Sequence, residues 1–184
     1  MTLNDMKRDT NPRNKVLDTY LASLERSSAL GKEVVQKPGN FRMLSGDRPT
    51  GSLHIGHLFG SLENRVWLQN LGVESFVVIA DYQVLNDRET KEPIDAYARE
   101  LTLDYLAAGM DPEHHSTYIF PQSHVPELNQ LFIPFLNLVS NAELNRNPTV
   151  KEEIRAAGLQ RVKAGMYTYP VHQAADILFC KANI

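Results

Sequence analysis

The chain has 184 residues, a net charge of -3 and a single cysteine, Cys180. This length allows one domain with a real core, and the lone cysteine excludes an internal disulfide framework. The charge gives no strong basic field for nucleic acid, although a local basic patch remains open. No apolar run approaches the roughly 18 residues of a membrane helix, and the polar N-terminus lacks the apolar core of a secretory signal. The composition predicts a soluble cytoplasmic protein without a membrane segment.

The first predicted element is an amphipathic helix in an N-terminal extension, residues 1–39. Apolar residues repeat there at helical spacing: Val16, Leu17, Tyr20, Leu21 and Leu24. Gly31 is expected to end this helix, and the turn residues at 37–40 separate it from the main fold.

Strands and helices then alternate along the chain. We expect short strands at 41–46, 75–81 and 116–120, and the second is a continuous apolar run typical of burial on both faces. Helices are expected from about Ile55 to Asn70, from Ile94 to a stop before Gly109, from Pro126 to about Val139, and from Pro148. This order predicts an α/β fold with a parallel sheet, in which ligands lie at the carboxyl ends of the strands.

The stretch SGDRPTGSLHIGH at 45–57 lies at that place, between the first strand and the next helix. Helix N-termini present unpaired N–H groups and partial positive charge, so they hold phosphates. His54 and His57 lie on one helical turn, where both can donate to phosphate oxygens as charge grows in a phosphoryl transition state. Three glycines are expected to remove side chains where a nucleotide approaches the backbone: Gly46, Gly51 and Gly56.

The histidine pair has two other interpretations. The pair can simply cap a helix on the surface, and for a single exposed histidine that is the better expectation. A zinc site is disfavoured because three or four ligands are needed and no further His or Cys lies nearby in sequence.

The second motif is MYTYPVHQAADILFC at 166–180. Pro170 is expected to start a helix whose apolar run encloses one carboxylate, Asp176. An apolar pocket with a single acceptor suits indole, because its ring N–H donates and cannot accept. A ligand without that donor would leave Asp176 unpaired, which gives discrimination. Spacing alone leaves equally open that Asp176 pairs locally on an exposed helix face.

Both motifs resemble a known family. SGDRPTGSLHIGHLFGSL is similar to the His-Ile-Gly-His region of class I aminoacyl-tRNA synthetases, and most similar to the tryptophan-specific branch. That resemblance implies a Rossmann-like parallel sheet with flanking helices. It also implies a set of residues against ATP, with His54 and His57 as the catalytic pair: Arg48, Pro49, Thr50, Gly56 and His57.

YPVHQAADIL resembles the tryptophan-binding helix of the same branch. The resemblance implies that Asp176 receives the indole N–H, that Gln173 lines the pocket and that Tyr169 contacts the amino acid. Leu44 and Gly46 match positions that flank the indole.

The chain departs from the family at two charged positions. Arg48 stands where the branch often has glutamine, and Glu153 stands where many relatives have a lysine. Arg146 and Lys151 keep positive charge in a segment that in relatives reaches ATP phosphate. For these two residues a solvated helix face is at least as good an interpretation.

The resemblance implies ATP-dependent activation of L-tryptophan and its transfer to tRNA(Trp) by a homodimer. Mg²⁺ would arrive with ATP and would need no dedicated protein site. Three alternatives stay open: a tyrosine-specific enzyme of the same subclass, another nucleotidyltransferase with a His-x-Gly-His turn, and a tryptophan-binding regulatory paralogue that no longer charges tRNA.

The resemblance covers about residues 40–184, a partial Rossmann-like catalytic domain with a helical insertion at about 121–165. It reaches only the first part of the family's length, because the sheet's last strands and the Lys-Met-Ser-Lys-Ser loop are absent. We therefore expect an N-terminal fragment of a longer enzyme, inactive alone and incomplete at its C-terminus. The sequence is similar to that of an auxiliary type of the tryptophan-specific enzymes found in some bacteria.

Overall fold

A three-stranded parallel sheet forms the centre of the computed structural model, which describes residues 12–87, 93–113, 115–156 and 162–184. Its strands are β1 (Arg42–Asp47), β2 (Glu74–Ile79) and β3 (Thr117–Pro121), in that order. In register, Leu44 lies opposite Phe76, and Phe76 lies opposite Tyr118. The prediction of a parallel α/β sheet is confirmed, with strand ends shifted by one or two residues.

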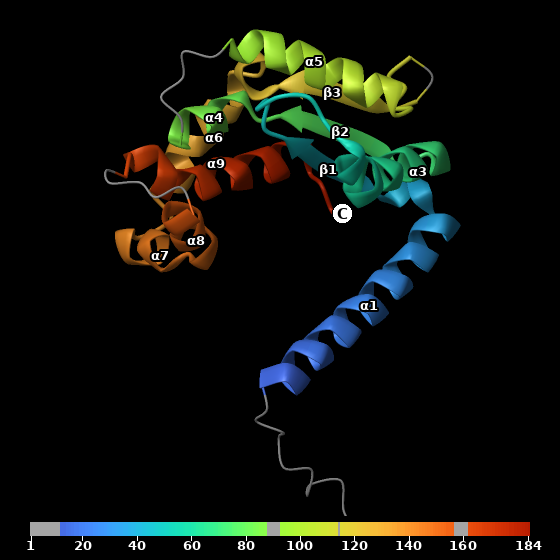
Figure 1. The fold of residues 1–184 in the computed structure, drawn as a ribbon, viewed down its shortest axis with the longest axis horizontal. Coiled ribbons are helices and arrows are strands. Elements are labelled where there is room, and N and C mark those ends of the chain that lie inside the picture. Colours follow the sequence, from blue (N-terminus) through green and yellow to red (C-terminus); the bar gives the residue numbers. More distant parts are fainter. Residues whose placement is uncertain (1–11, 88–92, 114, 157–161) are drawn as a thin grey trace, which may run out of the picture.

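Helices connect and flank these strands (Figure 1). They are α1 (Pro12–Gln36), α2 (Ile55–His57), α3 (Glu63–Leu71), α4 (Asp81–Asp87), α5 (Ile94–Ala107), α6 (Glu127–Leu136), α7 (Asn141–Arg146), α8 (Pro148–Ala156) and α9 (Ala164–Cys180). Short turns add η1 (Pro38–Asn40), η2 (Leu58–Leu62) and η3 (Gln122–His124). α9 lies beside β1 and contacts α4, α6, α7 and α8. The helices between β3 and α9 fall within the predicted insertion, while the proposed domain boundaries stay predictions.

Several helix ends follow their local signals. α8 begins at Pro148, and α5 ends at Ala107, two residues before Gly109, whose φ of +105° favours glycine. The helix expected from Ile55 to Asn70 is present as α2, η2 and α3, with a π-helical turn at η2 that the periodicity did not indicate. α6 ends at Leu136, three residues before the predicted end.

The prediction that Gly31 ends the first helix is wrong. α1 continues through Gly31 to Gln36, and Pro38 follows at the start of η1. A glycine inside a helix costs about 1 kcal/mol, and Val34, only 2% exposed, packs into the core one turn later. Packing of that last turn therefore outweighs the glycine. Farther from the sheet, α1 projects into solvent with Leu17 and Tyr20 exposed (Figure 1).

The prediction that Pro170 starts a helix is also wrong. α9 begins at Ala164, and Pro170 lies inside it. Proline lacks the N–H that would bond one turn back, yet Met166 and Val171 are buried on either side of it. Their burial carries the helix through the proline. Tyr169 therefore lies within α9, and the helix fixes the direction in which its side chain leaves the backbone.

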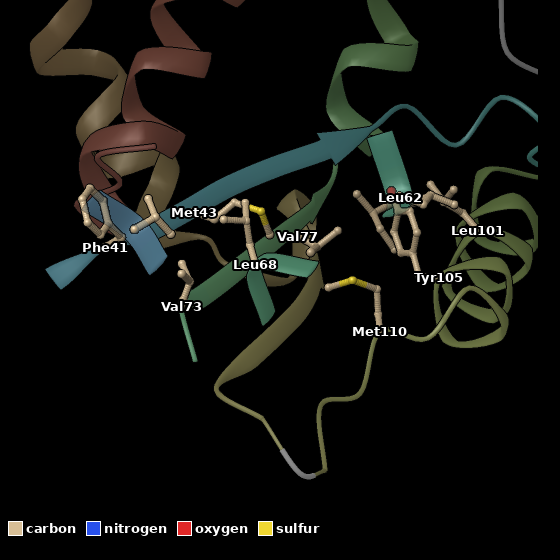
Figure 2. Packing of buried hydrophobic residues seen from close by; sticks show 11 residues of the cluster. Phe41, Met43, Leu62, Leu68, Val73, Val77, Leu101, Tyr105 and Met110 are labelled. Carbon is tan, nitrogen blue, oxygen red and sulfur yellow. The ribbon is translucent and has the colours of Figure 1, made fainter. Parts of the chain in front are cut away.

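The core lies between the sheet, α3 and α5 (Figure 2). Its buried residues include Phe41, Met43, Leu62, Leu68, Val73, Val77, Leu101, Tyr105 and Met110. Inside it, the Tyr105 hydroxyl and the Arg65 guanidinium each donate to Asp47 Oδ2 at 2.8 Å. Burial raises the pKa of Tyr105, so its hydroxyl remains a donor. This buried cluster fixes the carboxyl end of β1.

Gly46 in β1 is explained by the neighbouring strand. A Cβ placed there would lie 2.1 Å from the carbonyl oxygen of Val78 and 2.4 Å from its Cγ1. The close approach of β1 and β2 therefore requires glycine at this position, whatever ligand lies nearby.

We predict that Gly46→Ala destabilises the fold by about 1–3 kcal/mol, because the added methyl must push the strands apart. Urea unfolding followed by circular dichroism measures this change. Gly60→Ala is the matched control, since a Cβ at Gly60 would meet nothing within 4 Å. Equal stability of the Gly46→Ala and Gly60→Ala variants would contradict the role assigned to Val78.

Candidate active site

A cavity of about 390 Å³ opens at the carboxyl ends of β1 and β2, against α4 and α9. We call it the main cavity. Its lining residues are Leu44, Ser45, Gly46, Asp47, Arg48, Val78, Ala80, Gln83, Gln173, Asp176 and Ile177. The volume falls within the roughly 300–1,000 Å³ typical of small-molecule sites. The fold thus brings together four of the predicted tryptophan-binding residues, Leu44, Gly46, Gln173 and Asp176, with Arg48 from the predicted ATP-binding turn.

Asp176 is the one carboxylate of α9, and it is only 4% exposed. Its Oδ2 accepts a hydrogen bond from Gln122 Nε2 at 2.8 Å, while its Oδ1 is buried without a partner among the described residues. Burial raises the pKa of Asp176 to about 6, opposed by the hydrogen bond from Gln122. The alternative of local pairing on an exposed helix face is therefore excluded. At neutral pH this carboxylate offers one empty, charged acceptor.

A chain of hydrogen bonds behind Asp176 fixes its orientation. Gln122 Nε2 also lies 3.3 Å from His172 Nδ1, and His172 Nε2 lies 3.3 Å from Asn129 Oδ1. An amide nitrogen only donates, so His172 Nδ1 accepts and His172 Nε2 carries the proton. Burial lowers the pKa of His172, which favours this neutral form. Gln122 of η3 therefore donates to both Asp176 and His172 of α9, and His172 in turn donates to Asn129 of α6.

Gln122 and His172 were missed as functional residues by the sequence reasoning. The signal for Gln122 was available, because it follows β3 directly and polar residues after parallel strands gather at the ligand-binding edge. His172 gave no comparable signal, since its neighbours come from α6 and η3, distant in sequence.

Tyr169 lies beside the main cavity rather than in its lining. It lines a cavity of about 30 Å³ together with Arg48, Gln83, Glu153 and Met166. Arg48 and Gln83 line both cavities, so the two spaces adjoin. Burial raises the pKa of Tyr169 to about 12, helped by a hydrogen bond to Glu153 and opposed by the charge of Arg48. The Tyr169 hydroxyl thus stays protonated and donates to Glu153.

His54 and His57 form a capping box at the start of α2. His54 Nδ1 accepts from the backbone N–H of Gly56 at 3.1 Å, and His57 Nδ1 accepts from the backbone N–H of His54 at 3.2 Å. A Cβ on Gly56 would lie 2.9 Å from His54 Cε1, so the glycine makes room for the ring. The helix-capping interpretation is confirmed. Because both Nδ1 atoms accept, each neutral ring carries its proton on Nε2, which remains a possible donor to phosphate.

Two backbone hydrogen bonds hold the segment between β1 and α2. The backbone N–H of Thr50 donates to the carbonyl of Arg48 at 2.8 Å, and Pro49 within this turn is buried. The backbone N–H of Leu53 donates to Asp104 Oδ2 on α5 at 2.8 Å. Of the predicted ATP-binding residues, this arrangement brings Arg48 to the main cavity, whereas Pro49, Thr50, Gly56 and His57 are not among its lining residues.

Arg146 and Lys151 are exposed, in the last turn of α7 and on α8. Neither is among the residues that line the two adjoining cavities. The structure thus shows them as solvated side chains, and their contact with phosphate stays a prediction.

Two further observations concern metals and membranes. Among residues 12–87, 93–113, 115–156 and 162–184, no three His, Cys, Asp or Glu side chains gather where they could hold a metal ion. Within the same described ranges, no helix has both the length and the apolar character needed to cross a bilayer.

We predict that Gln122→Leu raises the pKa of Asp176 above about 6, because burial then acts without the opposing hydrogen bond. Carbon-detected NMR titration of the Asp176 carboxyl measures the shift. Gln173→Leu is the control and leaves the pKa of Asp176 unchanged, because Gln173 lines the same cavity but is not the hydrogen-bond partner of Asp176. An unchanged pKa in Gln122→Leu would show that Gln122 does not control this carboxylate.

Comparison with known proteins agrees with this geometry. A family model for class I tRNA synthetases (W and Y) matches residues 36–184. A tryptophan–tRNA ligase of Clostridium longisporum is 52% identical over 144 residues, covering 77% of this chain and 42% of that protein. One from Streptococcus agalactiae is 51% identical over 146 residues, with the same coverage of both chains. This chain therefore spans about 42% of the length of these curated relatives.

A solved structure gives the same result. Tryptophanyl-tRNA synthetase from Campylobacter jejuni, complexed with ADP and tryptophan, superimposes with a TM-score of 0.67 at 30% identity, over 74% of this chain and 41% of that one. The family model spans residues 36–184, which include the sheet and the residues that line both adjoining cavities, and the chain therefore belongs to the class I tRNA synthetase family of the tryptophan and tyrosine enzymes.

Proposed function

We propose that this chain carries the tryptophan-binding and ATP-binding part of a tryptophan–tRNA ligase, which activates L-tryptophan with ATP and transfers it to tRNA(Trp). The observation that carries this proposal is the buried Oδ1 of Asp176, an acceptor with no partner among the described residues, in a cavity of suitable size. Relatives about 50% identical, each a tryptophan–tRNA ligase, support the same activity.

The main cavity suits an indole ring. Leu44, Val78 and Ile177 offer apolar surface, and Asp176 Oδ1 accepts the ring N–H in our proposal. A buried acceptor left unpaired costs about 1–3 kcal/mol, so a ring without a donor binds less well. The cavity also borders Gln173 and the Gly46 backbone, which we assign to the same ligand.

The proposed reaction needs no covalent bond to the enzyme. An oxygen of the tryptophan carboxylate attacks the α-phosphorus of ATP, the bond to the β-phosphate breaks, and pyrophosphate leaves. Mg²⁺ enters with ATP as part of the substrate. The Nε2–H groups of His54 and His57 donate to phosphate oxygens as charge builds up, a contribution of roughly 10²–10³ in rate for one such donor.

The remaining assignments belong to the same proposal. Pro49, Thr50 and Gly56 contact ATP through the turn that Arg48 begins, and Arg146 and Lys151 supply positive charge for its phosphates. A homodimer, a cytoplasmic location and the auxiliary subtype stay predictions. The expectation of an N-terminal fragment is tested by whether the native reading frame continues past Ile184.

Amino-acid-dependent ATP–pyrophosphate exchange tests the activity, with tryptophan and tyrosine side by side, on the 184-residue chain and on the complete product of its reading frame. Exchange with tryptophan alone is the expected result for the complete product. Exchange with tyrosine would overturn the assignment of Asp176 as an indole acceptor. Tryptophan binding without exchange in the complete product would make this a binding paralogue.

We predict that tryptophan affinity falls as the pH drops through about 6. Burial raises the pKa of Asp176 to about 6, so the folded protein favours the protonated carboxyl. The contribution of this group to the free energy of unfolding is therefore fully present below about pH 4 and is lost as the pH rises through 6. The ionised carboxylate that forms above pH 6 is the stronger acceptor for the indole N–H. Calorimetric titration between pH 5 and pH 8 measures the profile.

Asp176→Asn is the control for that profile, because it keeps the shape and removes the charge. We expect weak binding that does not change with pH in this range. A wild-type affinity independent of pH, or the same profile in Asp176→Asn, would remove Asp176 from the binding reaction.

A second prediction separates the two roles of His54. In His54→Asn the asparagine oxygen replaces Nδ1 as the helix cap, while the Nε2–H donor is lost. We expect stability within about 0.5 kcal/mol of the wild type and adenylate formation slower by roughly 10²-fold. Urea unfolding and single-turnover kinetics measure the two effects. Unchanged kinetics would mean that His54 only caps the helix.

A further inference from the structure

We propose that Arg48 and Glu153 form a charge pair that recognises the two ends of the amino-acid zwitterion, with the Tyr169 hydroxyl placed between Glu153 and the ammonium group. This inference rests on the proposed function, because the indole must first occupy the main cavity. Arg48 and Glu153 are the two charged residues at which this chain departs from the pattern that the resemblance implies. The proposal gives both a role in binding the ammonium and carboxylate groups of the substrate.

The pair is visible only in the folded structure. Arg48 follows β1 and Glu153 lies on α8, yet both line the small cavity in which Tyr169 of α9 also lies. Arg48 and Gln83 also line the main cavity, where Asp176 lies. A ligand whose ring reaches Asp176 therefore extends its other end toward Arg48 and the small cavity.

The charges are arranged as a zwitterion requires. Arg48 alone would attract a carboxylate and repel an ammonium group, and its charge is felt at the Tyr169 hydroxyl, where it lowers the pKa. Glu153 supplies the compensating negative charge on the same hydroxyl and raises that pKa. Arginine and glutamate together are neutral, as is the amino acid, so neither end of the ligand meets an uncompensated charge.

Tyr169 connects Glu153 to the ligand. Its hydroxyl donates to Glu153, which leaves the hydroxyl oxygen free to accept from an ammonium N–H. Hydrogen bonds in series polarise one another, so the acceptor becomes stronger when its own proton is held by a carboxylate. Glu153 is therefore a positioning residue that acts through Tyr169. Arg48 contacts the ligand carboxylate directly. A guanidinium has five N–H donors, so Arg48 can hold this carboxylate while it keeps its interaction within the chain.

Four ligands separate these roles: tryptophan, tryptamine without the carboxylate, indole-3-propionate without the ammonium group, and indole with neither. Glu153→Gln should weaken tryptophan and tryptamine roughly 10–100-fold and leave indole-3-propionate and indole within about twofold. Arg48→Gln should weaken tryptophan and indole-3-propionate by a similar factor and spare tryptamine and indole. Calorimetric titration of each variant with each ligand measures the pattern.

Glu152→Gln, an exposed neighbour on α8, is the matched control and should change none of the four affinities. Equal losses for all four ligands in Glu153→Gln, or no loss for any, would overturn the charge pair while leaving the proposed function in place. Failure of indole and tryptophan to bind the unaltered protein would overturn the proposed function and the charge pair together.

Discussion

The hydrogen bond from Gln122 Nε2 to Asp176 Oδ2 is the contact on which the site depends. It joins the turn after β3 to α9 and so holds that helix across the carboxyl ends of the strands. One carboxylate oxygen is satisfied by this bond and the other is left buried without a partner in the described chain. Burying such a group is unfavourable in the free protein. A donor-bearing ligand that relieves this cost gains affinity and specificity from the same atom.

A second cluster of hydrogen bonds sets the end of the site at which we propose that ATP binds. Arg65 and Tyr105 donate to Asp47 at the end of β1, which fixes where Arg48 enters the main cavity. The histidines of the next turn are occupied by the backbone through Nδ1. Structural capping and phosphate donation are therefore compatible in one residue, because they use different ring nitrogens. Gly56 leaves room for the His54 ring and also donates its backbone N–H to that ring.

Arg48 and Glu153, the two departures from the pattern that the resemblance implies, lie around the same small cavity in the structure. In the sequence, Arg48 and Glu153 are two separate departures from the pattern that the resemblance implies, about a hundred residues apart. In the structure both lie around Tyr169, where the charge of one offsets the charge of the other. The positive charge of Arg48 thus has an electrostatic counterpart in the negative charge of Glu153. Charge balance within a small volume, rather than either residue alone, describes this part of the site.

The sequence by itself determined the parallel α/β sheet, the turn that carries His54 and His57, and the apolar helix that contains Asp176, because strand runs, caps and helical spacing are local properties. Tertiary structure decided the rest. Burial of Val34 and Met166 outweighed the helix-ending signal of Gly31 and the helix-starting signal of Pro170. The partners Gln122 and Glu153 come from distant elements, and no local pattern places them beside Asp176 and Tyr169. Such contacts depend on how whole elements pack, which is set by the shared core.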